Sequence, residues 1–356
     1  MAKYSIIVPV YNRPEEVDEL LDSLLKQDFS DFDVVIVEDG STTRCEEVVA
    51  RYRDKLDIHY YYKENSGPGP SRNYGVEHST GEWVLILDSD VVLPPGYLSS
   101  VDQNVVDDPC DAFGGPDRAH ESFTDIQKAI SYSMTSFLTT GGIRGGKQKL
   151  DKFHPRSYNM GIKREVYLQL GGFSPMRFGE DIDFSYRILE SGHTTKLYSD
   201  AWVWHKRRTN LDKFFKQVFN SGIARINLSK RHPGTLKLVH LLPMVFTIGV
   251  IFLLVSAVVM RLLEFSDSVG DGFRMGFPLG HTHLGWWVVP LIPVVLYILL
   301  VFIDSSIRNK SAVIGYLSIK SSFVQLFGYG FGFLTAWWKR CVLGKDEFSA
   351  FEKNFY

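Results

Sequence analysis

The sequence has few of the features that mark several large classes of protein. Its three cysteines, Cys45, Cys110 and Cys341, are far apart and form no CxxC pair, so we expect neither a disulfide framework nor structural zinc. The formal net charge is −2, whereas a nucleic-acid partner usually requires a basic excess, so no nucleic acid is expected. The chain enters a predicted strand after only four residues, which predicts that it has no signal peptide. We therefore expect a reduced, cytosolic setting for the soluble part.

A glycine-rich dinucleotide signature is also missing. The first predicted strand, Ser5–Val10, is followed by Tyr11-Asn12-Arg13-Pro14 and not by GxGxxG. Dinucleotide-dependent oxidoreductases need those glycines because the backbone must approach a pyrophosphate closely at this turn. An oxidoreductase is therefore disfavoured.

Short apolar runs alternate with helical patterns up to about residue 125. Ser5–Val10, Asp33–Glu38 and Trp83–Asp88 are compact, bounded by turn residues, and typical of buried parallel strands. The intervening helices are expected at Pro14–Gln27, with Asn12 or Arg13 as its cap, at about Thr43–Arg53 and at Ser71–Ser79. The pattern predicts an α/β fold with a doubly wound sheet, whose ligand crevice lies at the carboxyl ends of the strands.

The region from 110 to 230 is less regular. A basic, glycine-rich stretch, Gly141–Lys147, predicts a mobile loop. Helices are expected at about Lys163–Leu170, Asp181–Glu190 and Leu211–Leu228.

The last third of the chain is strongly apolar, although the mean hydropathy of the whole is only −0.06. Leu238–Met260 contains no Asp, Glu, Lys or Arg and is long enough to cross a hydrocarbon core of about 30 Å. Trp286–Ile303 is a second uncharged run, with Pro290 and Pro293 expected to kink it. A buried core helix is the alternative for each run.

A third apolar stretch, Ala312–Trp338, is interrupted by a lysine and ends in aromatic and basic residues. Gly328, Gly330 and Gly332 also interrupt the apolar stretch, and we interpret it as an interfacial or re-entrant helix and not as a full span. Basic residues flank the two spans, whereas the connection 261–285 holds only Arg261 and Arg274. The positive-inside rule then predicts a multi-pass protein of the inner (cytoplasmic) membrane with both ends in the cytosol.

Three acidic segments carry the candidate chemistry. Glu38-Asp39-Gly40-Ser41 and Asp88-Ser89-Asp90 each follow a predicted strand, and Glu180-Asp181 begins a predicted helix. Two carboxylates one residue apart can place one on a divalent cation and the other on a ribose hydroxyl, and hard oxygen ligands suit Mg²⁺ or Mn²⁺. The alternatives are a solvated surface pair for the second segment and simple helix capping for the third.

Taken in order, these and other short motifs resemble glycosyltransferase family 2, with its GT-A fold, over about residues 4–230. The other matching segments are Ser5–Asn12, Gly69–Gly75, Gly81-Glu82-Trp83, Asn159-Met160-Gly161, Gly171-Gly172-Phe173 and Gly179. The resemblance implies a membrane-anchored, inverting transferase that uses a nucleoside diphosphate sugar, with a UDP-sugar as the expected donor, and a Rossmann-like sheet.

The resemblance also implies roles for individual residues. Asp181 is the implied general base, and Glu180 orients the acceptor or supports its neighbour. Arg72 reaches the base or the phosphates, unless it is an ordinary surface arginine. Asp90 binds Mn²⁺ or Mg²⁺, and His205 completes the metal shell unless it is structural. The implied nucleotide-sugar contacts are Pro9, Tyr11, Asp39, Asp88 and Ser89, and the implied acceptor region is Asn159, Met160 and Gly172.

The sequence departs from the family pattern in two places. Glu38 stands where an aspartate is frequent, and no Gln-x-x-Arg-Trp motif of processive synthases follows His205. We therefore expect transfer of one sugar per encounter, and the membrane anchor favours a lipid-linked acceptor. The basic glycine loop 141–149 is expected to close over the donor, with a disordered surface loop as the alternative. The catalytic domain is expected at 1–230, with donor half 1–110 and acceptor half 111–230, and the membrane region at 231–356. A catalytically silent sugar-nucleotide-binding subunit of a polysaccharide assembly complex is the alternative.

Overall fold

The structure is a computed structural model that describes residues 2–120, 122–140, 153–270, 277–279 and 282–350. The chain forms two compact units. Unit 1 comprises Met1–Phe123, Lys147–Lys206 and Lys230–Pro233, and unit 2 comprises Thr124–Gly146, Arg207–Ser229 and Gly234–Tyr356. The units therefore interleave along the chain, whereas the sequence interpretation drew a single boundary at residue 230.

Unit 1 is built on a mixed sheet of seven strands in the order β3-β2-β1-β4-β8-β6-β9. The first four are parallel, and β8 runs antiparallel between β4 and β6. The strands are β1 (Tyr4–Val10), β2 (Phe32–Asp39), β3 (Ile58–Lys63), β4 (Trp83–Leu87), β6 (Ala112–Gly114), β8 (Asn159–Lys163) and β9 (Thr195–Leu197). The predicted α/β class and its first parallel strands are confirmed.

Strand β3 was missed in the sequence. Its residues, Ile-His-Tyr-Tyr-Tyr-Lys, form no continuous apolar run because the strand lies at the edge of the sheet and is only partly buried. A second, three-stranded sheet was also missed. It consists of β5 (Val91–Val92), β10 (Val203–His205) and β7 (Asp117–Arg118), each too short for a recognisable period.

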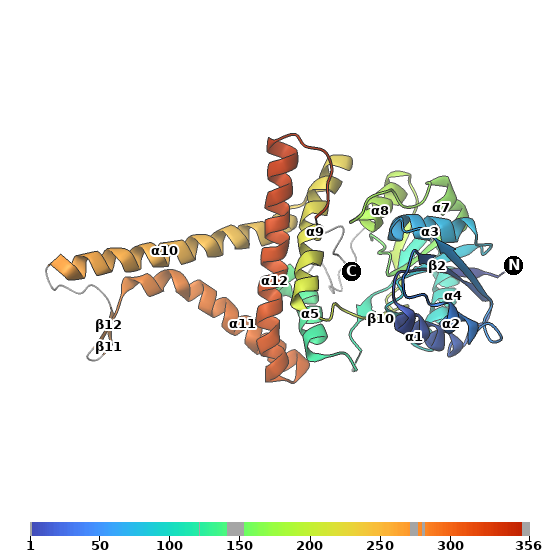
Figure 1. The fold of residues 1–356 in the computed structure, drawn as a ribbon, viewed down its shortest axis with the longest axis horizontal. Helices are drawn as coiled ribbons and strands as arrows, with labels where there is room; N and C mark the ends of the chain where they lie inside the picture. Colours follow the sequence, from blue (N-terminus) through green and yellow to red (C-terminus); the bar gives the residue numbers. More distant parts are fainter. Residues whose placement is uncertain (1, 121, 141–152, 271–276, 280–281, 351–356) are drawn as a thin grey trace. The chain divides into compact units, whose positions relative to one another are not determined.

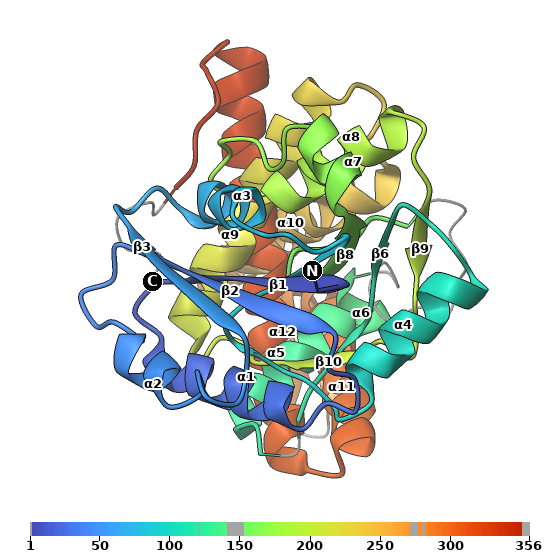
Figure 2. The ribbon, with the colours of Figure 1, turned by 90° about the vertical axis from the view of Figure 1, so that its right-hand side faces the viewer.

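Helices cover both faces of the large sheet because successive side chains of a strand point to opposite faces. Ile6 and Val8 of β1 join a core with Leu20 of α1, whereas Ile7 joins the opposite core with Val76 of α3. Figure 2 shows α1 and α2 on one side of β1 and β2, and α3 on the other. The helices of unit 1 are α1 (Pro14–Leu25), α2 (Glu46–Ala50), α3 (Pro68–Glu77), α4 (Tyr97–Asp107), α7 (Arg164–Gln169) and α8 (Glu180–Glu190).

The cap predicted for α1 is wrong. Arg13 holds the N-cap position, but no side chain caps the helix there. The Oδ1 atom of Asn12 instead accepts backbone N–H bonds from Thr42 and Thr43, both at 2.8 Å. Asn12 therefore joins the end of β1 to the turn after β2, a contact that a local helix signal cannot reveal.

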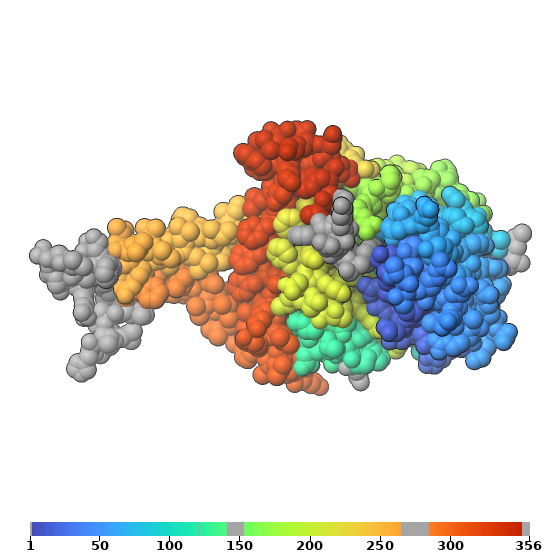
Figure 3. Space-filling model, viewed as in Figure 1, coloured from blue at the N-terminus to red at the C-terminus, as the bar shows by residue number. Residues whose placement is uncertain are grey.

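The described residues of unit 2 are helical apart from connecting turns and a short strand pair, β11 (Phe277–Leu279) and β12 (Thr282–Leu284). Two helical stretches, Leu238–Glu264 and Trp286–Asn309, are long and apolar enough to cross a membrane, each with a mean hydropathy of 2.6. Their apolar side chains are mostly exposed. The two stretches are coloured from yellow-orange to orange in Figures 1 and 3. The α-helices are α5 (Asp125–Thr135), α6 (Phe137–Thr140), α9 (Leu211–Arg231), α10 (Leu242–Gly270), α11 (Ile292–Asn309) and α12 (Ala312–Ala336).

Prolines and glycines act differently here from the sequence expectation. Pro290 lies in a 3₁₀ turn, Trp286–Leu291, and Pro293 lies in the first turn of α11, so both mark the beginning of the α-helix and do not kink it. The glycines of α12 lie inside a continuous helix, where they serve packing. A Cβ on Gly332 would lie 2.0 Å from the Phe219 carbonyl oxygen of α9, so the glycine permits a close helix crossing.

Candidate active site

The carboxyl end of β4 carries the predicted Asp88-Ser89-Asp90 segment. β10 pairs antiparallel with β5, and the register places His205 opposite Val91. Asp88, Asp90 and His205 can each offer one ligand atom within 4.8 Å of the others, and His205 Nε2 lies 3.2 Å from Asp90 Oδ1. Two carboxylates and an imidazole are a donor set that Mn²⁺ and Mg²⁺ accept, so these residues fit the expected metal.

The ring of His205 is oriented by residues that the sequence analysis did not identify. Asp117 of β7 places its Oδ2 3.7 Å from Nδ1, on the side away from Asp90. Tyr158 stacks on the imidazole, with ring centroids 4.9 Å apart. A carboxylate behind a histidine ligand directs the other nitrogen toward the metal. Both partners reach His205 only through the pairing of distant strands.

Arg72 joins the two halves of the site. Its side chain is 4% exposed, so the alternative of a surface arginine is wrong. Its Nη2 donates to Asp88 Oδ1 at 2.7 Å and its Nη1 donates to Glu180 Oε1 at 3.0 Å. One guanidinium from α3 therefore contacts both the carboxylate cluster after β4 and the first residue of α8.

Glu180 and Asp181 occupy the first turn of α8, after Gly179 in the left-handed region at φ 86°. Asp181 Oδ2 accepts from Arg156 Nε at 2.6 Å, and its Oδ1 accepts from the Ile182 backbone N–H at 2.9 Å. Burial raises the pKa of Glu180 to about 7 against the opposing charge of Arg72. Burial acts on Asp181 too, but the Arg156 guanidinium more than offsets it and holds the pKa of Asp181 below its usual range.

The third acid of this helix has other partners. Asp183 accepts from Arg187 Nε at 3.0 Å, and its Oδ1 lies 3.0 Å from His232 Nε2. His232 also contacts Glu190 at the far end of α8, at 2.9 Å. Asp183 and His232 thus hold α8 against the segment that follows α9, and sequence reasoning did not identify His232.

Asp39 is buried at the end of β2 and organises the loop before α3. Its Oδ1 accepts the Ser66 N–H at 2.9 Å and pairs with Lys63, and its Oδ2 accepts the Gly67 N–H at 2.8 Å. The structure therefore assigns Asp39 a structural function, and its contact with a nucleoside base stays a prediction.

Three other predicted donor contacts lie at the same edge of the sheet. Pro9 and Tyr11, at and just after the end of β1, are half-buried, and Ser89, after β4, is buried. Parallel strands bring these positions together at their carboxyl ends, next to Asp39 and Asp88. Their contacts with a nucleotide sugar stay predictions.

The predicted acceptor residues are mostly engaged in packing. Asn159 accepts from the Tyr97 hydroxyl at 2.7 Å and donates to the Ala201 carbonyl at 2.9 Å, and Met160 is fully buried. Gly172 lies at φ 64°, where a Cβ would meet Asn73 Oδ1 at 2.4 Å. These side chains support the site from inside, and their contact with an acceptor stays a prediction. The predicted closing loop, 141–149, lies outside the described residues.

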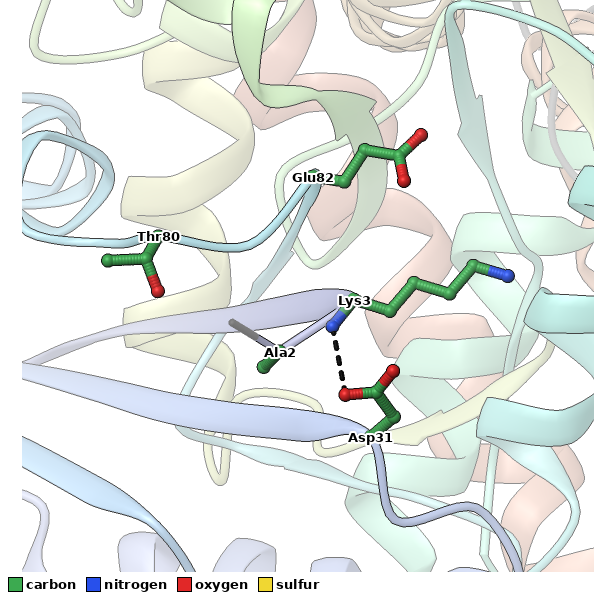
Figure 4. A pocket seen from close by; sticks show the side chains of 5 residues that line it. All are labelled: Ala2, Lys3, Asp31, Thr80 and Glu82. Carbon is green, nitrogen blue, oxygen red and sulfur yellow. Dashed lines mark hydrogen bonds between the residues drawn. The ribbon is translucent and has the colours of Figure 1, made fainter.

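A pocket of about 460 Å³ lies at the opposite edge of the sheet. Figure 4 shows its lining, which comes from the segments that precede β1, β2 and β4, namely Ala2, Lys3, Asp31, Thr80 and Glu82. The Lys3 backbone N–H donates to Asp31 Oδ1 at 3.1 Å. None of the predicted site residues contributes to this pocket.

Comparison with known proteins agrees with this arrangement. The family model "Glycosyl transferase family 2" matches residues 5–171. The poly(ribitol-phosphate) beta-N-acetylglucosaminyltransferase TarS of Staphylococcus aureus is 45% identical over 94 residues, 25% of this chain and 16% of TarS. The GalNAc(5)-diNAcBac-PP-undecaprenol beta-1,3-glucosyltransferase of Campylobacter jejuni is 32% identical over 117 residues, 32% of this chain and 38% of the relative. Both matches thus span well under half of the relative's own length.

Among solved structures, the fold is similar to that of the mannosyltransferase PcManGT of Pyrobaculum calidifontis in complex with GDP-Man and Mn²⁺. The TM-score is 0.56 at 16% identity, over 95% of this chain and 88% of that chain. This likeness concerns the fold. Together with the family match over residues 5–171, it shows that this chain carries a glycosyltransferase family 2 domain of GT-A fold.

Proposed function

We propose that this chain is an inverting, non-processive glycosyltransferase that moves one sugar from a nucleoside diphosphate sugar to a membrane lipid-linked acceptor, with a divalent metal and Asp181 as general base. The observation that carries the proposal is the linkage through Arg72. This single buried cation contacts Asp88 of the cluster and Glu180 beside Asp181. Sugar transfer requires that the groups that bind the donor diphosphate and the base that deprotonates the acceptor lie close to the same anomeric carbon.

The donor half of the proposal depends on the carboxylate cluster. Asp88, Asp90 and His205 would hold Mn²⁺ or Mg²⁺, which when bound neutralises the charge of the leaving diphosphate. Arg72 adds a fixed positive charge on the same side. Pro9, Tyr11, Asp39 and Ser89 would enclose the nucleoside, with a UDP-sugar as the expected donor.

The acceptor half depends on the two apolar helices. A lipid-linked hydroxyl is presented at the bilayer surface, so helices that cross the membrane would keep the site near it. The name of the Campylobacter jejuni relative includes an undecaprenol-linked acceptor, which supports this class, whereas that of TarS includes a poly(ribitol-phosphate). Asp181 would take the proton of the attacking hydroxyl as it bonds to the anomeric carbon.

Donor binding and turnover are tested on the full chain in detergent or nanodiscs. With Mn²⁺ present, one member of a panel of UDP-, GDP- and dTDP-sugars should raise the melting temperature, since a ligand at 100 times its Kd stabilises by about 2.7 kcal/mol. Release of nucleoside diphosphate with that sugar should follow. A melting shift without any release, even with lipid acceptors present, would favour the alternative of a silent binding subunit. No shift with any donor would contradict both.

Topology is tested by labelling with a membrane-impermeant maleimide. The native Cys341 is exposed and must first be replaced by Ser. In that background, Ser268→Cys lies in the predicted external connection and should react in intact cells. The native Cys341, expected in the cytosol, is the matched control and should react only after permeabilisation. The opposite pattern would reverse the orientation and place the catalytic unit outside.

A further inference from the structure

We propose that Arg156 binds a phosphate group carried by the acceptor, close to the hydroxyl that receives the sugar, and so aligns this hydroxyl with Asp181. This inference rests on the proposed function and narrows its acceptor class. Three features of the molecule support it, namely the turn that precedes β8, the unequal exposure of Arg156 and Asp181, and the direction of their hydrogen bond.

The turn 156–159 contacts both chemical halves of the site. Arg156 reaches Asp181 of α8, and Tyr158, two residues later, stacks on the metal-ligand candidate His205. Asn159 bonds back to the Arg156 carbonyl at 3.0 Å and lies opposite Leu87, the last residue before Asp88. An acceptor hydroxyl held between the candidate metal site and Asp181 would therefore lie close to this turn.

The Arg156–Asp181 pair is asymmetric. The side chain of Arg156 is 32% exposed, whereas that of Asp181 is 11% exposed. Within the described part of the chain, the hydrogen bonds of the Arg156 side chain run only from Nε to Asp181. The two terminal nitrogens thus form the accessible end of the guanidinium. They present the planar fork of N–H donors that binds phosphate oxygens in a bidentate manner.

Binding of a phosphate to Arg156 would also change the basicity of the Asp181 carboxylate. While Arg156 contacts only Asp181, its full positive charge stabilises the ionised carboxylate of Asp181 and makes it a weaker base. A phosphate on the terminal nitrogens neutralises much of that charge, which restores basicity only when the acceptor is in place. Two sources can supply this phosphate, a sugar attached to a lipid by diphosphate or a polyol phosphate.

The experiment compares two acceptor pairs with the full chain. One pair is N-acetylglucosamine joined to a short polyprenyl chain through diphosphate, against the same sugar joined through an ether. The other is ribitol 5-phosphate against ribitol. We expect wild-type kcat/KM to favour one phosphorylated acceptor by about 10-fold to 100-fold, since a hydrogen-bonded charge contributes about 1.5–3 kcal/mol. The favoured pair identifies the source of the phosphate.

The decisive readout is the phosphate preference of Arg156→Gln, because the ratio cancels any effect of the substitution that is common to both acceptors of a pair. It should fall to about 1, with Arg156→Lys intermediate, while UDP still shifts the melting temperature. Arg51→Gln removes an exposed arginine at the C-cap of α2 and should keep the wild-type ratio. A ratio that survives in Arg156→Gln, or a wild type without preference, would overturn the inference. So would a loss of UDP binding in Arg156→Gln with the ratio intact, because Arg156 would then serve the donor. Absence of donor binding and of turnover in the wild type would instead refute the proposed function.

Discussion

Asp181→Asn is expected to cut turnover by about 10²-fold or more while leaving donor and metal binding nearly intact. A sugar hydroxyl is a poor nucleophile at neutral pH, so a base must lie within hydrogen-bond reach of it. Asp88 and Asp90 belong to the candidate metal site, and Asp39 accepts hydrogen bonds from the loop before α3. Asp183 contacts Arg187 and His232. Of the acidic residues that the sequence analysis placed in the site, Asp181 and its neighbour Glu180 remain as candidates for the base. Turnover is measured as product formed per enzyme, with the UDP-induced melting shift as the control.

The pH profile separates the two neighbours. A base must be deprotonated to act, so kcat/KM falls as pH falls through its pKa in the free enzyme. If Asp181 acts, its lowered pKa in the absence of acceptor predicts a flat kcat/KM from pH 8 to about pH 5. If Glu180 acts, its pKa of about 7 predicts a loss of about tenfold per pH unit below neutrality. The matched variant Glu180→Gln reports which group is responsible. Normal turnover in Asp181→Asn with a dead Glu180→Gln would move the base to Glu180, and normal turnover in both would reject this helix as the catalytic one.

Asp90→Ala is expected to abolish nearly all transfer. The substitution removes one of the two carboxylates from a site that must hold a divalent cation against a diphosphate. EDTA should likewise stop the wild-type enzyme, and Mn²⁺ or Mg²⁺ should restore it. Asp107→Ala, an exposed carboxylate of α4, is the matched control and should behave as wild type.

The residues around Asp90 should show a graded effect. His205→Ala removes a candidate ligand and is expected to weaken the apparent metal affinity while transfer is retained at high Mn²⁺. Asp117→Asn is expected to weaken this affinity by about 10-fold to 100-fold, the scale found for residues that orient metal ligands. Titration of Mn²⁺ against initial rate measures this shift. Full activity of the wild type in excess EDTA would contradict the whole account of the site.

Local patterns were sufficient for much of unit 1. Ser5–Val10 and Asp33–Glu38 are apolar runs bounded by turns, and both lie inside parallel strands of the sheet, as predicted. The position of Asp88 at a strand end follows from the same signal. These elements are readable because a buried strand imposes its requirement on every residue of the run, so the signal is repeated. The same holds for the two apolar helical stretches of unit 2, where length and composition decide.

Only the tertiary structure decided how the site residues combine. The sequence suggested His205 by resemblance alone, and strand pairing is what places it beside Asp90 with Asp117 and Tyr158 behind it. The sequence alone does not distinguish Arg72 from a surface arginine, whereas the structure buries it and joins it to Glu180 of α8. Arg156 carried no signal, since a single arginine in an irregular stretch has no period and no neighbouring motif. Such contacts join residues far apart in the chain, and their geometry is set by sheet order and helix packing, which no local pattern encodes.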